Sequence, residues 1–505
     1  MGGREDTSGT LRHAPARSGM LSHSFTMAAA LLRSGMIWRM VQLRSFQANA
    51  VAEIRGAYQS GHRRVLFVLP TGGGKTFTFV YIAEQAAIRG NRVCILVHRQ
   101  ELVDQASRSL QAIGCNHGVI AAGYRQDLRQ GVQVASVQTL ARRLHQLPAD
   151  FFQLLIVDEA HHAVAGTWAK VLAAMPRAHV LGVTATPERL DGRGLGDQFD
   201  VMVEGPDAAW LTQEGFLVRA RVFAPPGIDL SAVKRFDTKK GRHDADDILR
   251  QGQAMGDAVS HYRRTIAEVH NGTAISFCCS VAHAEAVAEA FREQGIPAAT
   301  LDGTMDRGHR RRLIADLGAG VLKVLTSCDI ISEGTDIPSV TGAILLRPTD
   351  SLGLHLQQVG RVLRPCPGKP YAVVNDHVGN TLRHGLPTDP REWSLEGRPK
   401  GQSRKPSDAI PIRICPSCFS AIPSTANPCP ECGHEVEQAR RKLVTVEGDL
   451  RELTGAEMRR QERREVAKAR TREELETIAR DRGYKPGWVA HMLAARGQHH
   501  ARAFG

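Results

Sequence analysis

The sequence has no long apolar run. No stretch approaches the roughly 18 consecutive apolar residues of a membrane span, so we expect a soluble protein without a membrane partner. The apolar run at residues 28–32 is stopped by Arg33, so it makes a poor signal peptide. We interpret residues 1–39 as a disordered leader or as the product of a start codon set too early. Glu5 and Asp6 argue against the alternative of a transit peptide.

The cysteines do not form the framework of a disulfide-stabilised protein. Six of the ten are scattered or adjacent to one another, and four lie close together near the carboxyl terminus. Small secreted folds spread their cysteines through the whole domain, so this clustering favours a metal site in a reducing compartment. We therefore expect a cytoplasmic protein.

Positive charge is in excess. The chain has 65 Lys and Arg residues against 52 Asp and Glu residues, a net charge of +13. Such an excess favours a polyanionic partner, although solubility alone would also explain it. With 505 residues, the chain is long enough for two α/β domains and additional segments.

Short apolar runs alternate with helical patterns in two separate series. The runs lie at residues 65–69, 93–97, 132–136, 154–157 and 180–183, and again at 274–277, 298–301, 321–326, 343–346 and 372–374. This alternation predicts the α/β class, with two parallel sheets that are each covered by helices on both faces.

These patterns divide the chain into seven segments. They are a leader (1–39), a first lobe (40–205), an inter-lobe connection (206–260), a second lobe (261–385), a basic linker (386–412), a four-cysteine module (413–436) and a charged helical tail (437–505). Within the basic linker, turn formers and positive charge at residues 398–406 predict an extended, mobile stretch. Capping boxes that begin at Thr454 and Thr471 predict helix starts in the tail. We interpret the tail as a solvated surface, with a nucleic-acid or partner contact as the alternative.

A glycine-rich loop follows the first apolar run. Residues 69–76 read Leu-Pro-Thr-Gly-Gly-Gly-Lys-Thr and precede a helical pattern, so backbone N–H groups at a helix N-terminus can bind phosphate oxygens. We expect Lys75 to reach the β and γ phosphates of ATP and Thr76 to bind Mg²⁺. The other expected ATP-binding residues of the loop are Thr71, Gly72, Gly73 and Gly74. Leu69 stands where the motif has glycine.

Two carboxylates follow the run at residues 154–157. Asp158 can hold the magnesium shell, and Glu159 can orient and deprotonate a water molecule. A phosphate-binding loop followed downstream by such a strand end predicts an ATP-hydrolysing enzyme.

The order of these motifs resembles a superfamily 2 helicase of the DEAH-box type over roughly residues 41–380, with the tetrad at residues 158–161. The resemblance implies two tandem RecA-like parallel-sheet lobes. It further implies that Arg44 and Gln47 read adenine, and that Thr184 and Thr186 couple ATP hydrolysis to nucleic-acid binding.

The resemblance extends to the second lobe. Residues 326–338 are similar to the block that touches both strand and nucleotide, with Thr326 on the strand and Gly334 and Asp336 on the nucleotide. Residues 357–364 resemble the arginine-finger motif, which implies catalytic roles for Gln357, Arg361 and Arg364. Such arginines neutralise charge on the γ-phosphate and contribute about a thousandfold in known cases.

Nucleic-acid contacts are implied for the first lobe. His98, Arg99, Ser136 and Thr139 occupy positions where family members touch the sugar-phosphate backbone. Helix capping or a surface loop would explain each residue taken singly. Backbone contacts carry no sequence information, so we expect little sequence preference and an affinity that falls steeply with salt.

Within the superfamily, the Thr-Ala-Thr-Pro motif, residues 344–349 and the trailing cysteines most resemble the RadD-type bacterial DNA-repair ATPases. That branch implies single-stranded or branched DNA as substrate, a repair or single-strand-binding protein as partner, a monomer, and a nucleoid-associated location. RNA helicases, restriction-system motors and phage replication motors share most of these motifs. A catalytically silent DNA-binding scaffold is the alternative from another class.

Paired cysteines form the module that resembles a zinc ribbon. Cys415 and Cys418 are followed by Cys429 and Cys432, so four thiolates can surround one ion. Four thiolate ligands without an open position indicate structural Zn²⁺, with a rubredoxin-type iron site as the alternative. The module then either grips single-stranded nucleic acid or serves only as a docking surface.

Overall fold

The computed structural model describes most of the two lobes. Its described residues are 43–162, 166–189, 193–224, 230, 233, 235–249, 253–328, 337–397, 412–435, 466, 469, 471–482 and 487–493. Gly334, Asp336, the leader (1–39), Thr454 and most of the basic linker lie outside them. The chain divides into two units, Met1–Val436 and Glu437–Gly505.

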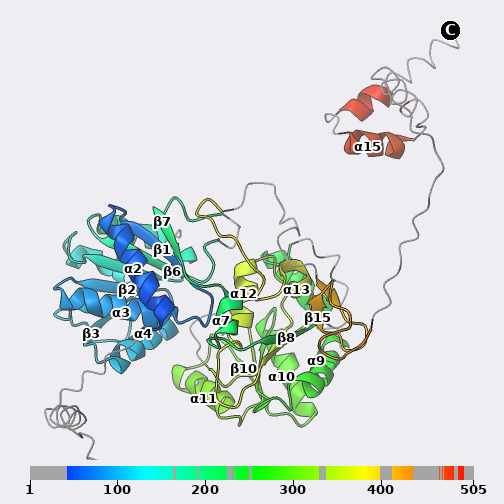
Figure 1. Ribbon diagram of the computed structural model, residues 1–505, viewed down its shortest axis with the longest axis horizontal. Helices are drawn as coiled ribbons and strands as arrows, with labels where there is room; N and C mark the ends of the chain where they lie inside the picture. Colours follow the sequence, from blue (N-terminus) through cyan, green and yellow to red (C-terminus); the bar gives the residue numbers. More distant parts are fainter. Residues whose placement is uncertain are drawn as a thin grey trace, which may run out of the picture. The chain divides into compact units, whose positions relative to one another are not determined.

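The first lobe, drawn in blue to blue-green in Figure 1, is built on a seven-stranded parallel sheet. The strand order is β3-β4-β2-β5-β6-β1-β7. Its strands are β1 (Arg64–Val68), β2 (Val93–Val97), β3 (His117–Ile120), β4 (Val132–Ser136), β5 (Leu154–Asp158), β6 (His179–Thr184) and β7 (Val201–Glu204). All five predicted apolar runs are strands. The outer strands β3 and β7 escaped prediction because half-buried residues interrupt their apolar character.

Helices cover both faces of this sheet. The helices α2 (Ser45–Gln59), α3 (Lys75–Ile88) and α4 (Gln100–Ala112) pack into one apolar cluster, and α5 (Val137–Arg143) and α6 (Gly166–Ala174) pack into the other. Short 3-10 helices lie at Leu144–Gln146 and Ala160–His162. Alternate residues of each strand enter opposite clusters, as the twofold period of a strand requires: Leu66 faces one cluster and Phe67 the other.

The second lobe has a six-stranded parallel sheet in the order β10-β11-β9-β12-β13-β8. Its strands are β8 (Ala220–Phe223), β9 (Ala274–Phe277), β10 (Ala298–Leu301), β11 (Val324–Ser327), β12 (Gly342–Leu345) and β13 (Ala372–Asp376). Its helices are α8 (Lys239–Leu249), α9 (Gln253–Thr265), α10 (Val281–Glu293), α11 (Arg307–Gly318), α12 (Leu352–Gly360) and α13 (Asn380–His384). Strand β8 lies within the range expected for the inter-lobe connection, which also contains the short α7 (Ala208–Gln213).

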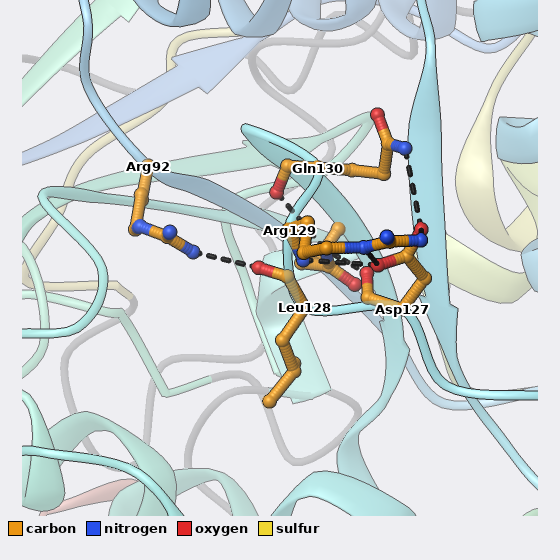
Figure 2. Close-up of polar contacts among 6 residues, drawn as sticks. Arg92, Asp127, Leu128, Arg129 and Gln130 are labelled. Carbon is orange, nitrogen blue, oxygen red and sulfur yellow. Dashed lines mark hydrogen bonds and ion pairs between the residues drawn. The ribbon is translucent and has the colours of Figure 1, made fainter.

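The loop between β3 and β4 is held by the carboxylate of Asp127 (Figure 2). This carboxylate accepts hydrogen bonds from the backbone and guanidinium of Arg129 and from Gln130. These bonds to the charged form lower its pKa. Arg92 donates to the carbonyl of Leu128 at 2.8 Å, which ties the loop to the start of β2.

Residues 386–397, named here the returning segment, leave the second lobe and pack on the first. Trp393 and Leu395 contact the apolar cluster beneath α5 and α6. The carbonyl oxygen of Leu395 accepts a hydrogen bond from Gly196 N at 2.7 Å, and Gly397 forms a β-bridge with Arg193. This part of the expected basic linker therefore packs on the first lobe through its partly buried apolar side chains. The stretch for which mobility is expected, residues 398–406, lies outside the described residues.

The four-cysteine module forms a small antiparallel hairpin of β14 (Ile412–Ile414) and β15 (Ala421–Pro423). In the second unit, α15 (Arg472–Asp481) begins at the predicted capping box. There, the side chain of Thr471 accepts from Glu474 N, and the carboxylate of Glu474 accepts from Thr471 N. Among the described helices, none combines the length and apolar character that a lipid bilayer would require.

Candidate nucleotide site between the lobes

The phosphate loop, residues 69–76, connects β1 to α3. Gly72 and Gly74 have φ values of +86° and +96°, which favour glycine. A Cβ atom on Gly73 would lie 2.9 Å from Leu69 Cγ, so a larger residue does not fit there. The ammonium of Lys75 donates to the carbonyl of Leu69 at 3.0 Å. The loop therefore keeps backbone N–H groups at the N-terminus of α3.

Leu69 occupies the position where the motif has glycine. Its side chain is fully buried beside Gly73 and Gly205, and its backbone N–H donates to Thr184 at 3.1 Å. Its φ is not positive, so no glycine is needed at this point. The departure from the motif is explained by packing.

The acidic pair lies at the carboxyl end of β5. Asp158 and Glu159 are both 9% exposed, and Glu159 N donates to Asp158 Oδ1 at 3.1 Å. Glu159 has a φ of +51°, a strained conformation for a residue with a side chain. This turn directs the polypeptide out of the sheet directly after the strand.

His161 links the acidic pair to the end of β6. Its Nδ1 lies 3.5 Å from Glu159 Oε2 and 3.1 Å from Thr184 Oγ1. The hydroxyl of Thr184 donates to the carbonyl of Thr186 at 2.8 Å. Thr186 in turn lies close to Gly353 of α12: a Cβ atom on Gly353 would be 2.9 Å from Thr186 Oγ1. These contacts therefore lead from the acidic pair to the second lobe. Sequence reasoning gave His161 no role, although it belongs to the tetrad.

The arginine segment, residues 361–364, lies against the phosphate loop. It directly follows α12, and a Cβ atom on Gly360 would lie only 2.5 Å from Thr71 Cβ. A Cβ atom on Gly72 would lie 3.5 Å from Arg364 Cγ. Arg361 is 6% exposed, and burial lowers the pKa of Arg364 to about 10. Gln357 is buried on α12.

The ammonium of Lys75 is within electrostatic reach of both lobes. Burial lowers its pKa most, while Glu159 and Asp158 raise it. Arg361 and Arg364 lower it further. Three cations and two carboxylates therefore surround one position, where a bound polyanion would relieve the repulsion among the cations.

Gln47 and Arg44 lie on the other side of the phosphate loop. Gln47 Nε2 donates to the carbonyl of Gly74 at 3.3 Å, and Gln47 Oε1 accepts from Arg44 N at 3.0 Å. The guanidinium of Arg44 lies 4.4 Å from the centroid of the Phe216 ring. Phe216 comes from the connection between the lobes, and sequence reasoning missed it because its partners are distant along the chain.

The four residues predicted to contact a nucleic-acid backbone lie near the carboxyl ends of β2 and β4. Arg99 Nε donates to His98 Nε2 at 3.3 Å. Gln138, which was not predicted, accepts from Ser136 Oγ at 2.8 Å and donates to the carbonyl of His98 at 3.2 Å. Thr139 lies in the first turn of α5. The adjacent strands thus bring these residues to one edge.

Thr326 does not lie with these residues. It is fully buried in β11, where its hydroxyl donates to the carbonyl of Ala284 at 2.8 Å and lies 3.0 Å from Thr300 Oγ1. This placement does not support direct contact between Thr326 and a nucleic-acid strand. The lobes also meet through an ion pair of 2.7 Å between Arg310 on α11 and Glu101 on α4.

The cysteine geometry fits a four-thiolate metal site. The sulfur atoms of Cys415 and Cys432 are 3.7 Å apart, those of Cys418 and Cys429 are 3.8 Å apart, and all four lie within 4.8 Å of one another. Sulfur atoms at the corners of a tetrahedron with Zn–S bonds of about 2.3 Å would be about 3.8 Å apart. The residues therefore fit Zn²⁺.

The four-cysteine module is fixed to β8 at the edge of the second sheet. Glu431 pairs with Arg219 and, at 2.7 Å, with Arg221 Nε. Ala224 N donates to the carbonyl of Phe419 at 2.9 Å, and Figure 1 places β15 beside β8. The module thus covers a sheet edge that would otherwise expose unpaired backbone groups.

A second group of potential ligands lies in the second lobe. Asp246, Cys279 and His283 each offer a ligand atom, and these atoms lie within 4.8 Å of one another. Ser280 donates to both carboxylate oxygens of Asp246, at 2.8 and 3.0 Å, and caps α10 by accepting from His283 N. These contacts give the group a structural explanation.

Family models match both lobes. Residues 40–189 match the model described as type III restriction enzyme, res subunit, and residues 257–366 match the helicase conserved C-terminal domain. A 51.5 kDa protein of a Lactococcus phage is 34% identical over 378 residues, which span 74% of this chain and 79% of that protein.

Two cellular relatives carry more informative names. IRC3 of Saccharomyces cerevisiae, named as an ATP-dependent helicase, is 31% identical over 67% of this chain. The match spans only 51% of the length of IRC3. The DNA 3'-5' translocase XPB2 of Sulfurisphaera tokodaii is 25% identical over 64% of this chain and 79% of that protein.

Among solved structures, a fragment of a type I restriction enzyme HsdR subunit from Vibrio vulnificus has a similar fold. The TM-score is 0.53 at 20% identity, over 71% of this chain and 67% of that one. Both lobes are therefore of the RecA-like helicase type.

Gly360 tests whether the close approach of the lobes is needed. In Gly360→Ala the new methyl group would clash with Thr71, so we expect kcat for ATP hydrolysis to fall by about tenfold or more with little loss of thermal stability. The matched control is Gly318→Ala in α11, whose methyl would lie an ordinary 3.5 Å from Ile337. A wild-type kcat in Gly360→Ala would show that hydrolysis does not need the close approach of Gly360 to Thr71.

Proposed function

The chain belongs to superfamily 2 of the helicases, which are ATP-hydrolysing enzymes, and from this we propose that it is a nucleic-acid-dependent ATPase that translocates on DNA. The main support is that Lys75, the acidic pair and the arginine segment converge across the lobes. The basic net charge of +13 also favours a polyanionic partner.

In this proposal the first lobe binds and activates ATP. The backbone of the phosphate loop and Lys75 hold the phosphates, and Thr76 and Asp158 would hold Mg²⁺, which neutralises phosphate charge when bound. Glu159 orients the attacking water and accepts its proton. Its contact with His161, 3.5 Å away, places this base next to the residues that lead to the second lobe. Gln47 and Arg44 bind the adenine.

The second lobe completes the site. Arg361 and Arg364 stabilise the charge on the transferred phosphoryl group, with Gln357 beside them on α12. Because these arginines act only while they face the phosphate loop, hydrolysis and product release change the affinity between the lobes. Thr184 and Thr186 lie between Glu159 and α12, so a change at Glu159 on hydrolysis would reach the second lobe through them. Gly334 and Asp336 are proposed nucleotide contacts, and Thr326 is an indirect support of the strand-binding block.

DNA is the proposed track. The name of the translocase relative from Sulfurisphaera tokodaii supports DNA, and His98, Arg99, Ser136 and Thr139 provide a backbone-binding edge on the first lobe. We assign the chain to the DEAH-box, RadD-type branch, with a role in DNA repair or recombination as a monomer on single-stranded or branched DNA. This finer assignment depends on the motif resemblance.

We propose that the four-cysteine module binds Zn²⁺ and serves as a docked part of the second lobe. The ion pairs of Glu431 with Arg219 and Arg221 favour docking on the second lobe rather than binding of single-stranded nucleic acid. A bound ion would supply folding free energy to a segment with little core of its own.

The substrate is tested by ATPase assays on single-stranded, duplex, forked and branched DNA, with matching RNA. We expect single-stranded or branched DNA to stimulate turnover most and the stimulation to fall steeply as salt rises. Stronger stimulation by RNA would reassign the track, and no stimulation by any nucleic acid would favour a catalytically silent scaffold.

Two substitutions separate binding from hydrolysis. Lys75→Ala should lower kcat/KM by about a hundredfold or more through lost phosphate binding. Glu159→Gln should keep nucleotide affinity but abolish turnover, which traps a closed complex on DNA. Nucleotide titrations and DNA retention measure these outcomes. Hydrolysis at the wild-type rate in Glu159→Gln would refute the general-base assignment.

Glu431 distinguishes docking from gripping. Glu431→Gln removes the ion pairs to β8, so we expect faster proteolysis within residues 412–435 and unchanged DNA affinity. The exposed Glu435→Gln serves as the matched control. Zinc content, measured on both variants, reports whether the metal site survives. A large loss of DNA affinity with unchanged proteolysis would favour the strand grip.

A further inference from the structure

Lys369 is a buried cation with an unusual set of acceptors. It is only 6% exposed. Its ammonium donates to four backbone carbonyl oxygens: Pro338 at 3.2 Å, Val340 at 2.6 Å, Val362 at 2.7 Å and Arg364 at 2.9 Å. Because an ammonium has only three N–H groups, these acceptors use its whole donor capacity.

The four carbonyls belong to two segments that meet the nucleotide site. Val362 and Arg364 lie within the arginine segment. Pro338 ends the block that by resemblance touches strand and nucleotide, and Val340 follows it, two residues before β12. One side chain therefore joins the main chains of both segments.

A tight turn places Lys369 at this position. Lys369 N donates to the carbonyl of Cys366 at 3.0 Å, and Gly368 has a φ of +79°. Proline followed by glycine at the two central positions, Pro367 and Gly368, is typical of a type II turn. The turn reverses the chain directly after the arginine segment, so the side chain points back at it.

We propose that Lys369 is the positioning residue of the arginine segment: it fixes the main chain of residues 362–364 to the segment at residues 338–340, so that Arg361 and Arg364 face the phosphate loop. The inference rests on the proposed ATPase function. Lys369 touches no part of the phosphate loop in the described contacts, so it acts through the arginines.

The ammonium form is the one that can do this. A neutral amine has two N–H groups and a lone pair, and the lone pair repels a carbonyl oxygen. Burial lowers the pKa of Lys369 to about 8; the Cys366 thiol raises it, and Arg364 lowers it. These two are the titratable or charged groups that act on it from the described residues. Positioning should therefore weaken as pH rises through about 8.

Stability should change in the opposite direction. The folded-state pKa of about 8 lies below the ordinary 10.5, so the unfolded chain binds more protons between these values. The contribution of Lys369 to stability therefore increases with pH over this range. A fall in activity there would not come from unfolding through this group.

The experiment compares Lys369→Met and Lys369→Arg in the full chain. We measure kcat, KM, nucleotide affinity and thermal stability with single-stranded DNA from about pH 6.5 to about pH 9.5. Lys323→Met is the matched control, because Lys323 lies in the same lobe and donates to a single carbonyl, that of Asn271 at 2.8 Å.

We expect the wild-type kcat to fall as pH rises through about 8. Lys369→Met should lower kcat about a hundredfold, the loss that a misplacement of about 1 Å produces, with nucleotide affinity nearly unchanged and no alkaline decline. Lys369→Arg keeps its charge at high pH, so it should recover part of kcat and also lack the decline.

Two results would overturn the inference. One is a wild-type kcat in Lys369→Met, and the other is an alkaline decline in Lys369→Arg that matches the wild type. If an arginine variant does not fold, the methionine variant and the wild-type profile decide the question. An inactive wild-type enzyme would instead refute the proposed function, which separates the two failures.

Discussion

The approach of Gly360 to Thr71 is the contact on which the candidate site depends. It brings two guanidinium groups from one lobe to the lysine and carboxylates of the other. The two carboxylates offset part of the repulsion among the three cations, and a bound triphosphate would relieve more of it. In the proposed function, hydrolysis changes the charge between the lobes and thereby their affinity for each other.

Strand β8 and the residues directly before it contact several parts of this arrangement. Leu217 lies against Gly72 of the phosphate loop, and Val218 N donates to the carbonyl of Leu363 in the arginine segment at 2.8 Å. At its other end β8 carries the four-cysteine module. The returning segment, residues 386–397, provides a second link between the lobes. The two lobes are thus joined by the residues that precede β8 and by the returning segment.

The departures from expectation have physical causes. Leu69 replaces a glycine because its backbone needs no positive φ and its side chain fills the core. Thr326 is buried, since a residue in the middle of a covered parallel sheet faces other elements and not solvent. Residues 386–397 were assigned to the linker but pack on the first lobe, because Trp393 and Leu395 bury part of their apolar surface there.

The sequence by itself determined the two α/β patterns, the phosphate loop, the acidic strand end and the four cysteines, because each depends on residues adjacent along the chain. Only the tertiary structure decided that Phe216 meets Arg44, that Glu431 docks the module on β8 and that Lys369 joins two segments of the second lobe. Phe216, Glu431 and the carbonyls of Pro338 and Val340 are distant along the chain from the residues they meet, so these contacts form only once the strand order brings the loops together.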